Sequence, residues 1–150
     1  MERDIYKNIL IATDGSQNSV QAIDAGMEIA RLSNGKAYAL HVTDKSIYIS
    51  GREDPKWIRL MEEKFKTFGL EITATVEEAA KAAGVEVEFV ILEGHPAEKI
   101  LDFAEKNAVD MIVVGSLGKT DVERFLLGSV SEKVVRNAKV PVLVVHGKRS

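Results

Sequence analysis

Short apolar runs alternate with amphipathic segments along the whole chain, and this alternation restricts the fold more than any other feature of the sequence. Hydrophobicity is nearly continuous in Asn8–Thr13, which is typical of a strand buried on both faces of a parallel sheet. Strands that alternate with helices predict a doubly wound α/β fold, with one five-stranded parallel sheet and helices on both faces. The predicted strands are 8–13, 36–42, 86–92, 111–114 and 140–145.

Bulk composition excludes several classes of protein. The 150 residues are 45% hydrophobic and 29% charged, and we interpret them as one domain spanning 1–150. The net charge of −3 gives no basic surface for nucleic acid, and the absence of cysteine excludes disulfides and thiolate metal sites. We see neither a signal peptide nor an apolar run long enough to cross a membrane, so we expect a cytoplasmic protein.

The stretch from Met111 to Ser131 carries the clearest functional signal. A predicted strand ends at Gly115, Gly118 follows in a loop, and Gly128 and Ser129 open a helix, which gives the spacing G-x2-G-x9-G-S. Glycine allows the main chain to approach a ligand closely and to adopt positive φ. A helix N-terminus adds unsatisfied N–H donors and the positive end of a dipole. We therefore interpret this stretch as a phosphate-binding loop.

The spacing resembles the nucleotide-binding signature of the universal stress protein family, in the branch that binds ATP. The resemblance extends to Thr13-Asp14-Gly15-Ser16, His41-Val42, Gly94-His95-Pro96-Ala97 and the C-terminal V-P-V-L-V-V. One departure is Leu117, where relatives often carry a basic or imidazole side chain. The resemblance implies an adenine nucleotide α hydrolase-like sheet of strand order 3-2-1-4-5. In that order Asp14 and Gly115 follow neighbouring strands and border one crevice.

ATP, bound with Mg (or Mn), is the expected ligand of this crevice. Gly115, Gly118, Gly128 and Ser129 would surround the phosphates, with the N–H groups of Ser129 and Val130 as donors and the hydroxyl of Ser131 as a further contact. By resemblance, the backbone of Val42 reads the adenine edge, and Ala12 and Thr13 lie under the base or ribose, although core packing accounts for these three residues equally well.

Three charged residues have alternative interpretations. Asp14 either stabilises its own turn or contacts a ribose hydroxyl or a metal-bound water. Lys119 and Arg124 either belong to a solvated loop or neutralise the terminal phosphate. A Walker A loop is excluded, because it requires glycine where the chain has Val113 inside a predicted strand.

Two further features concern structure more than chemistry. An amphipathic stripe runs from Trp57 to Ala83, and because a helix of that length is long for this domain, we expect a bend at Gly69. The three histidines lie far apart in the sequence, so we expect none to bind a metal, and His95 before Pro96 is expected to cap a helix.

The sequence leaves more than one function open. We favour a regulatory or sensor domain that binds ATP and hydrolyses it slowly or not at all, since no loop residue is fixed as a base and we assign no catalytic residue. Its regulatory protein partner is unknown. The alternative is a nucleotide-free scaffold of the same fold, and a flavodoxin-like flavin site is a third candidate. In the first two cases the apolar edge Val140–Val145 predicts a homodimer.

Overall fold

A computed structural model describes residues 6–13, 17–44, 54–116 and 128–146. In this part of the chain five parallel strands form one sheet of order β3-β2-β1-β4-β5, which confirms the predicted fold class and strand order. The strands are β1 (Asn8–Thr13), β2 (Lys36–Thr43), β3 (Glu86–Glu93), β4 (Met111–Gly115) and β5 (Val142–Val145).

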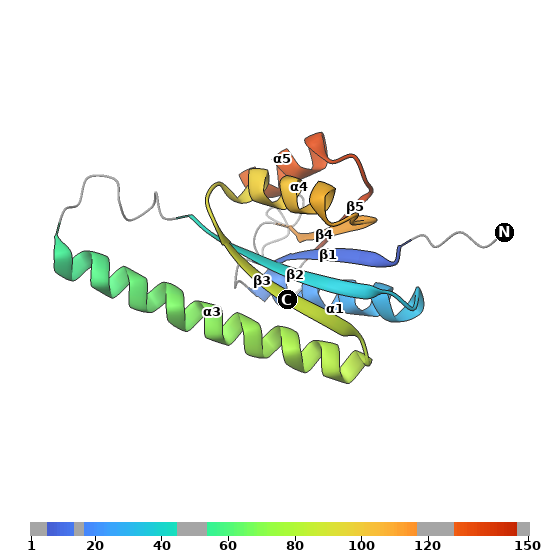
Figure 1. The fold of residues 1–150 in the computed structure, drawn as a ribbon, viewed down its shortest axis with the longest axis horizontal. Helices are drawn as coiled ribbons and strands as arrows, with labels where there is room; N and C mark the ends of the chain where they lie inside the picture. The colour runs from blue at the N-terminus through green and yellow to red at the C-terminus, as the bar shows by residue number, and fades with distance from the viewer. Residues whose placement is uncertain (1–5, 14–16, 45–53, 117–127, 147–150) are drawn as a thin grey trace.

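Helices cover both faces of the sheet, as Figure 1 shows. Helices α1 (Gln17–Leu32) and α3 (Pro55–Ala83) lie on one face, and α4 (Pro96–Lys106) and α5 (Ser129–Asn137) lie on the other. The side chains of a strand point alternately to the two faces. Ile9 and Ile11 therefore pack in the cluster under α1 and α3, whereas Leu10 packs in the cluster under α4.

The centre of the sheet is fully buried because both faces of β1 and β4 are covered. Ile9, Leu10, Ile11 and Ile112 are each 0% exposed, which explains the near-continuous hydrophobicity of these strands. Where β1 begins, the Asp110 carboxylate accepts hydrogen bonds from the backbone N–H groups of Lys7 and Asn8, both at 2.9 Å. This contact joins the segment before β4 to the start of β1.

Helix α3 is one unbroken helix that runs straight along its length in Figure 1, so the bend predicted at Gly69 is not observed. Its 29 residues begin after Asp54, whose carboxylate accepts from the N–H of Lys56 at 3.0 Å, and end before Gly84 at φ 68°. Gly69 instead lies buried against β3, where an added Cβ would stand 3.6 Å from Cδ1 of Ile91. A glycine in a helix does not interrupt its hydrogen bonds.

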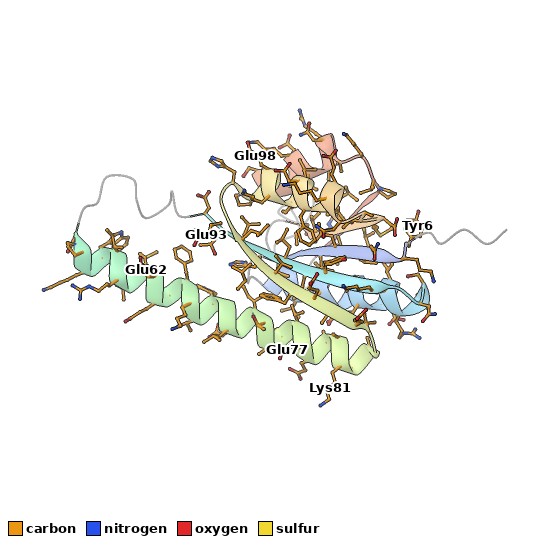
Figure 2. All side chains as sticks on the ribbon, in the orientation of Figure 1. Tyr6, Glu62, Glu77, Lys81, Glu93 and Glu98 are labelled. Carbon is orange, nitrogen blue, oxygen red and sulfur yellow. The ribbon has the colours of Figure 1, made fainter. Side chains whose placement is uncertain are left out.

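The buried residues of α3 all belong to its C-terminal part, from Gly69 to Ala80. The N-terminal part extends past the sheet, and the charged side chain of Glu62 is seen on this projecting part in Figure 2. At 1.5 Å per residue the whole helix is about 44 Å long. The helix is thus longer than the strands it covers, which is why only its C-terminal half packs against the sheet.

The two edge strands of the sheet match the sequence pattern, except that β5 is shorter than predicted. The alternation predicted in β3 is observed, and β3 and β5 are the two edge strands. Strand β5 begins at Val142, later than the predicted Val140, although the Pro141 carbonyl still accepts from the N–H of Ile112 at 3.0 Å. Proline has no N–H to contribute to a ladder, so regular pairing starts after it.

The N-terminus of α4 differs from the prediction in one respect. His95 occupies the position before the helix, as expected, but its side chain makes no capping hydrogen bond. None of the helices in the described residues is long and apolar enough to cross a membrane.

Candidate functional site

The carboxyl ends of β1 and β4 lie side by side at the centre of the sheet. Their ladder pairs Ile11 with Val113, so continuing the register by two residues brings Thr13 next to Gly115. From here the chain turns to opposite faces, with α1 following β1 and α5 following β4. In open α/β sheets ligands bind in the crevice at this kind of switch point. We take the place where β1 and β4 end as the candidate site, and we call it the crevice.

Thr13 is held firmly at the end of β1. Its side chain is only 6% exposed, and its hydroxyl donates to the carbonyl of Leu40 on β2 at 3.3 Å. Ala12, the preceding residue, is half-buried against the cluster under α4. The two residues predicted to lie under the base or ribose thus belong to the sheet's carboxyl end, where their packing also supports the core.

His41 is a residue of this region whose contact the sequence did not reveal. It pairs in register with Thr13, is 9% exposed, and places Nδ1 2.9 Å from the Thr13 carbonyl oxygen. In the sequence His41 is part of the resembling pair His41-Val42, but no partner is predicted for its side chain. Within the described residues no group of three His, Cys, Asp or Glu side chains could hold a metal. The sequence signal available was its position at the end of a buried strand, which does not identify a partner.

Val42 lies one residue past the end of the β1–β2 ladder. The last pair of that ladder is Thr13 with His41, whereas β2 continues to pair with β3. The Leu40 carbonyl faces β1, since it accepts from Thr13, and groups two residues apart in a strand face the same side. The Val42 carbonyl therefore faces the space beyond the end of β1, which is the orientation that its predicted role requires.

Helix α5 begins at the predicted residue and points its N-terminus at the end of β4. Gly128 is the N-cap, and the first intrahelical bond runs from the N–H of Glu132 to the Gly128 carbonyl at 2.9 Å. The N–H groups of Ser129, Val130 and Ser131 therefore have no partner within the helix. Ser129 is exposed. The helix offers donors at the place where the sequence predicted a phosphate.

The helix N-terminus is attached to the strand by Ser131. Its hydroxyl donates to the carbonyl of Gly115 at 3.2 Å. This bond uses the hydroxyl proton, while the lone pairs of the oxygen stay available to accept. Ser131 thus has an observed role in joining α5 to β4 beside its predicted contact with phosphate.

The conformation of Gly128 corrects one part of the sequence interpretation. Its φ is −66° and its ψ is 163°, an extended conformation that any residue adopts. Positive φ is found among the described glycines only at Gly84 and Gly94. What glycine offers at Gly128 is therefore the missing side chain, which leaves the main chain accessible to a ligand.

Several predicted residues lie outside the described residues. These are Asp14, Gly118, Lys119 and Arg124, together with the departure at Leu117. Their predicted contacts with ribose, metal and phosphate stay predictions.

In the described residues two ion pairs lower the pKa of a carboxyl group, and both pairs lie away from the crevice. Arg31 lowers the pKa of Glu28 by hydrogen bonding on α1, and Lys139 lowers the pKa of Glu105 in the same way at 2.6 Å. Lys139 precedes β5, so this second pair is at the amino ends of the strands. Neither pair is placed to act on a ligand at the carboxyl ends.

The fold and site together define an α/β domain of the kind that binds ligands at the switch point of a doubly wound sheet. The chain belongs to the universal stress protein family, whose family model matches residues 5–146. It is 43% identical to universal stress protein MJ0531 of Methanocaldococcus jannaschii, over 94% of this chain and 82% of that protein.

Solved structures agree with the fold over nearly the whole chain. Hypothetical protein MJ0577 superposes with a TM-score of 0.81 at 31% identity, covering 97% of this chain and 99% of the other. A universal stress protein in complex with cAMP superposes with a TM-score of 0.69 at 28% identity, covering 95% and 98%. At least one relative with this fold therefore binds an adenine nucleotide.

Proposed function

We propose that this protein is an ATP-binding universal stress protein domain, which acts as a cytoplasmic sensor or regulator. One observation carries the proposal: the N-terminus of α5 stands at the carboxyl end of β4 and is fixed there by the bond from Ser131 to Gly115. The relative that binds cAMP supports an adenine nucleotide as the class of ligand. ATP and its metal are our own extension of that support.

The nucleoside would occupy the ends of β1 and β2. The Val42 carbonyl faces the space past β1 and can accept from the exocyclic amine of adenine. Ala12 and Thr13 would lie under the base or ribose, and Asp14 follows Thr13 directly and would bind a ribose hydroxyl or a metal-bound water. These contacts select the base and sugar without depending on the number of phosphates.

The phosphates would occupy the N-terminus of α5. The N–H groups of Ser129 and Val130 and the helix dipole favour an anion there, and each such interaction contributes about 0.3–1 kcal/mol. Several must therefore act together, with Gly115, Gly118 and Gly128 keeping the main chain accessible and Lys119 or Arg124 neutralising the terminal phosphate. Mg or Mn would be held chiefly by the phosphate oxygens, which are the hard ligands that these ions prefer.

We expect slow turnover or none. Phosphoryl transfer requires a nucleophile held in line and stabilisation of charge in the transition state. We assign no residue of this chain as the base or the charge-stabilising group that such a step requires. Binding that reports on nucleotide levels fits these residues better than catalysis.

Ser129 offers a sharp test because it is exposed at the first position of α5. In Ser129→Asp a carboxylate at a helix N-terminus should stabilise the unliganded protein by about 0.3–1 kcal/mol. The same charge should repel a triphosphate and weaken ATP binding more than tenfold, since two unit charges 4 Å apart interact by about 4 kcal/mol at an effective dielectric of 20. Ser129→Asn, which is similar in shape and uncharged, is the matched control.

The measurements are thermal unfolding without ligand and calorimetric titration with MgATP. For the wild-type protein, ATP at 100 times its Kd should add about 2.7 kcal/mol to the free energy of unfolding. A wild-type protein with no response to millimolar MgATP contradicts the proposal. So does a Ser129→Asp variant that binds ATP as tightly as Ser129→Asn.

We further propose that the protein is a homodimer through β5. This strand pairs with β4 on one side and is the edge of the sheet, and all four of its residues are half-buried. The Val145 carbonyl accepts from the N–H of Ser116 on the β4 side, so the backbone groups of Val144 face outward. An outward row of backbone donors and acceptors favours pairing with a second copy.

Proline at position 144 would remove one outward donor while leaving the bonds to β4 in place. Val144→Pro should therefore shift the protein towards the monomer in light scattering, whereas Val144→Thr should not. A wild-type protein that is monomeric at micromolar concentration contradicts the dimer. A stable dimer that binds no ATP would favour the scaffold function instead.

A further inference from the structure

The carboxyl ends of β1 and β2 are joined by side chains as well as by the ladder. Thr13 makes two such contacts. Its hydroxyl donates to the carbonyl of Leu40, and its own carbonyl oxygen lies 2.9 Å from Nδ1 of His41. Both Thr13 and His41 are buried. Beyond this point β1 ends, so these contacts fix the last residue of the strand.

The chemistry of the His41 contact determines the state of the ring. A carbonyl oxygen can only accept a hydrogen bond, so Nδ1 must carry a proton and donate. In the neutral ring the proton is then on Nδ1, and Nε2 is an acceptor. The structure therefore assigns the Nδ1–H tautomer to neutral His41.

The bonded carbonyl belongs to the peptide unit through which the chain leaves β1. The bond from His41 therefore fixes the orientation of the last carbonyl of β1. The donor of the bond, His41, immediately precedes Val42. The Val42 carbonyl faces the space beyond the end of β1. One hydrogen bond thus sets the relative position of two backbone groups that border the nucleoside end of the crevice.

We propose that His41 is a positioning residue of the nucleotide site, which holds the end of β1 and the backbone of Val42 in the arrangement that binds the nucleoside. This inference rests on the proposed function. It also makes a distinction within the site, since His41 acts at the base and sugar, whereas α5 acts at the phosphates. Loss of the hydrogen bond between His41 and Thr13 should therefore weaken the binding of AMP and of ATP by the same factor.

Two substitutions separate the hydrogen bond from the volume of the ring. The amide nitrogen of asparagine is the same number of bonds from Cβ as Nδ1, so His41→Asn keeps a donor for the Thr13 carbonyl. His41→Leu keeps an apolar side chain of similar size and removes the donor. Both variants lose the packing of the imidazole, so a merely structural role would affect both.

The experiment is calorimetric titration of the wild-type protein and both variants with AMP and with MgATP, well below each melting temperature. We expect His41→Leu to bind both nucleotides roughly tenfold more weakly than the wild type. The affinity of His41→Asn should stay within about twofold of the wild type. In the wild-type protein, ¹⁵N NMR of the imidazole should report a proton on Nδ1 and none on Nε2 at a pH where the ring is neutral.

Three results would overturn the assignment and leave the proposed function in place. A folded His41→Leu variant that binds both nucleotides like the wild type excludes a positioning role, although the proposed function would stand. A loss seen with ATP but not with AMP would place the effect at the phosphates. A neutral ring protonated on Nε2 alone would show that the bond to Thr13 does not exist. A wild-type protein that binds neither nucleotide would instead refute the proposed function, and this role with it.

Discussion

Gly26 and Gly69 are both buried glycines in long helices, yet the structure predicts opposite effects for their replacement by alanine. Glycine inside a helix is less stable than alanine by about 0.5–1 kcal/mol, so alanine gains that amount wherever a methyl group fits. At Gly69 the nearest atom to an added Cβ is Cδ1 of Ile91 at 3.6 Å, an ordinary contact. Gly69→Ala should therefore stabilise the protein by about 0.5–1 kcal/mol.

At Gly26 the methyl group does not fit. An added Cβ would stand 2.5 Å from Cγ1 and 2.6 Å from Cδ1 of Ile11, and Ile11 is 0% exposed. Overpacking of a buried site costs about 1–3 kcal/mol, which exceeds the gain in helix propensity. Gly26→Ala should therefore lower the free energy of unfolding by about 1–2 kcal/mol. At an m-value of about 2 kcal/mol per molar urea, the unfolding midpoint falls by roughly 0.5–1 M.

A double-mutant cycle identifies the cause. Ile11→Ala alone should cost about 2–5 kcal/mol, because it leaves a cavity. In that background the clash is absent, so Gly26→Ala should become stabilising, and the coupling between the two positions should be favourable. Equilibrium urea unfolding of the four proteins measures this. A Gly26→Ala variant as stable as the wild type would mean that α1 does not approach β1 as closely as the structure has it.

Three further predictions concern the borders of the sheet. Asp110→Ala removes the acceptor of two backbone N–H groups, those of Lys7 and Asn8, and should cost about 1–3 kcal/mol in urea unfolding; a cost near zero would mean that water replaces the carboxylate without loss. Ser131→Ala breaks the bond to the Gly115 carbonyl and should cost about 0.5–1.5 kcal/mol, with faster amide exchange in the first turn of α5; unchanged exchange would show that packing alone fixes this helix. Lys139 lowers the pKa of the exposed Glu105 carboxyl, so the pair stabilises the fold above the ordinary pKa of glutamate and loses this contribution as the pH falls through the lowered value. Lys139→Met should raise that pKa in a carboxyl ¹³C titration, and an unshifted titration would show that the pair does not form in solution.

The sequence by itself was sufficient for the fold class and for the start of α5. A strand repeats every two residues and a helix every 3.6, so each segment shows its type within a short window. The glycines and Ser129 showed where a strand ends and a helix begins, and the last helix starts at Ser129 as predicted. Strand order came from the family resemblance, since periodicity within a segment does not say which strands are neighbours.

The local pattern was less informative where burial or a missing donor decided the outcome. A bend at Gly69 was predicted because α3 exceeds the size of the domain, but the helix has its own hydrogen bonds and extends past the sheet. The last strand was predicted from Val140, yet regular pairing starts only at Val142, after Pro141. In each case the predicted element is observed, but its boundary or its shape differs from the prediction.

Only the tertiary structure determined which side chains meet at the crevice. The bond from His41 to Thr13 joins residues 28 apart, and the bond from Ser131 to Gly115 joins residues 16 apart. Such contacts depend on the register between parallel strands and on the side of the sheet to which each crossover returns. Neither quantity is contained in a short window of sequence, because both are set by how the segments pack on one another.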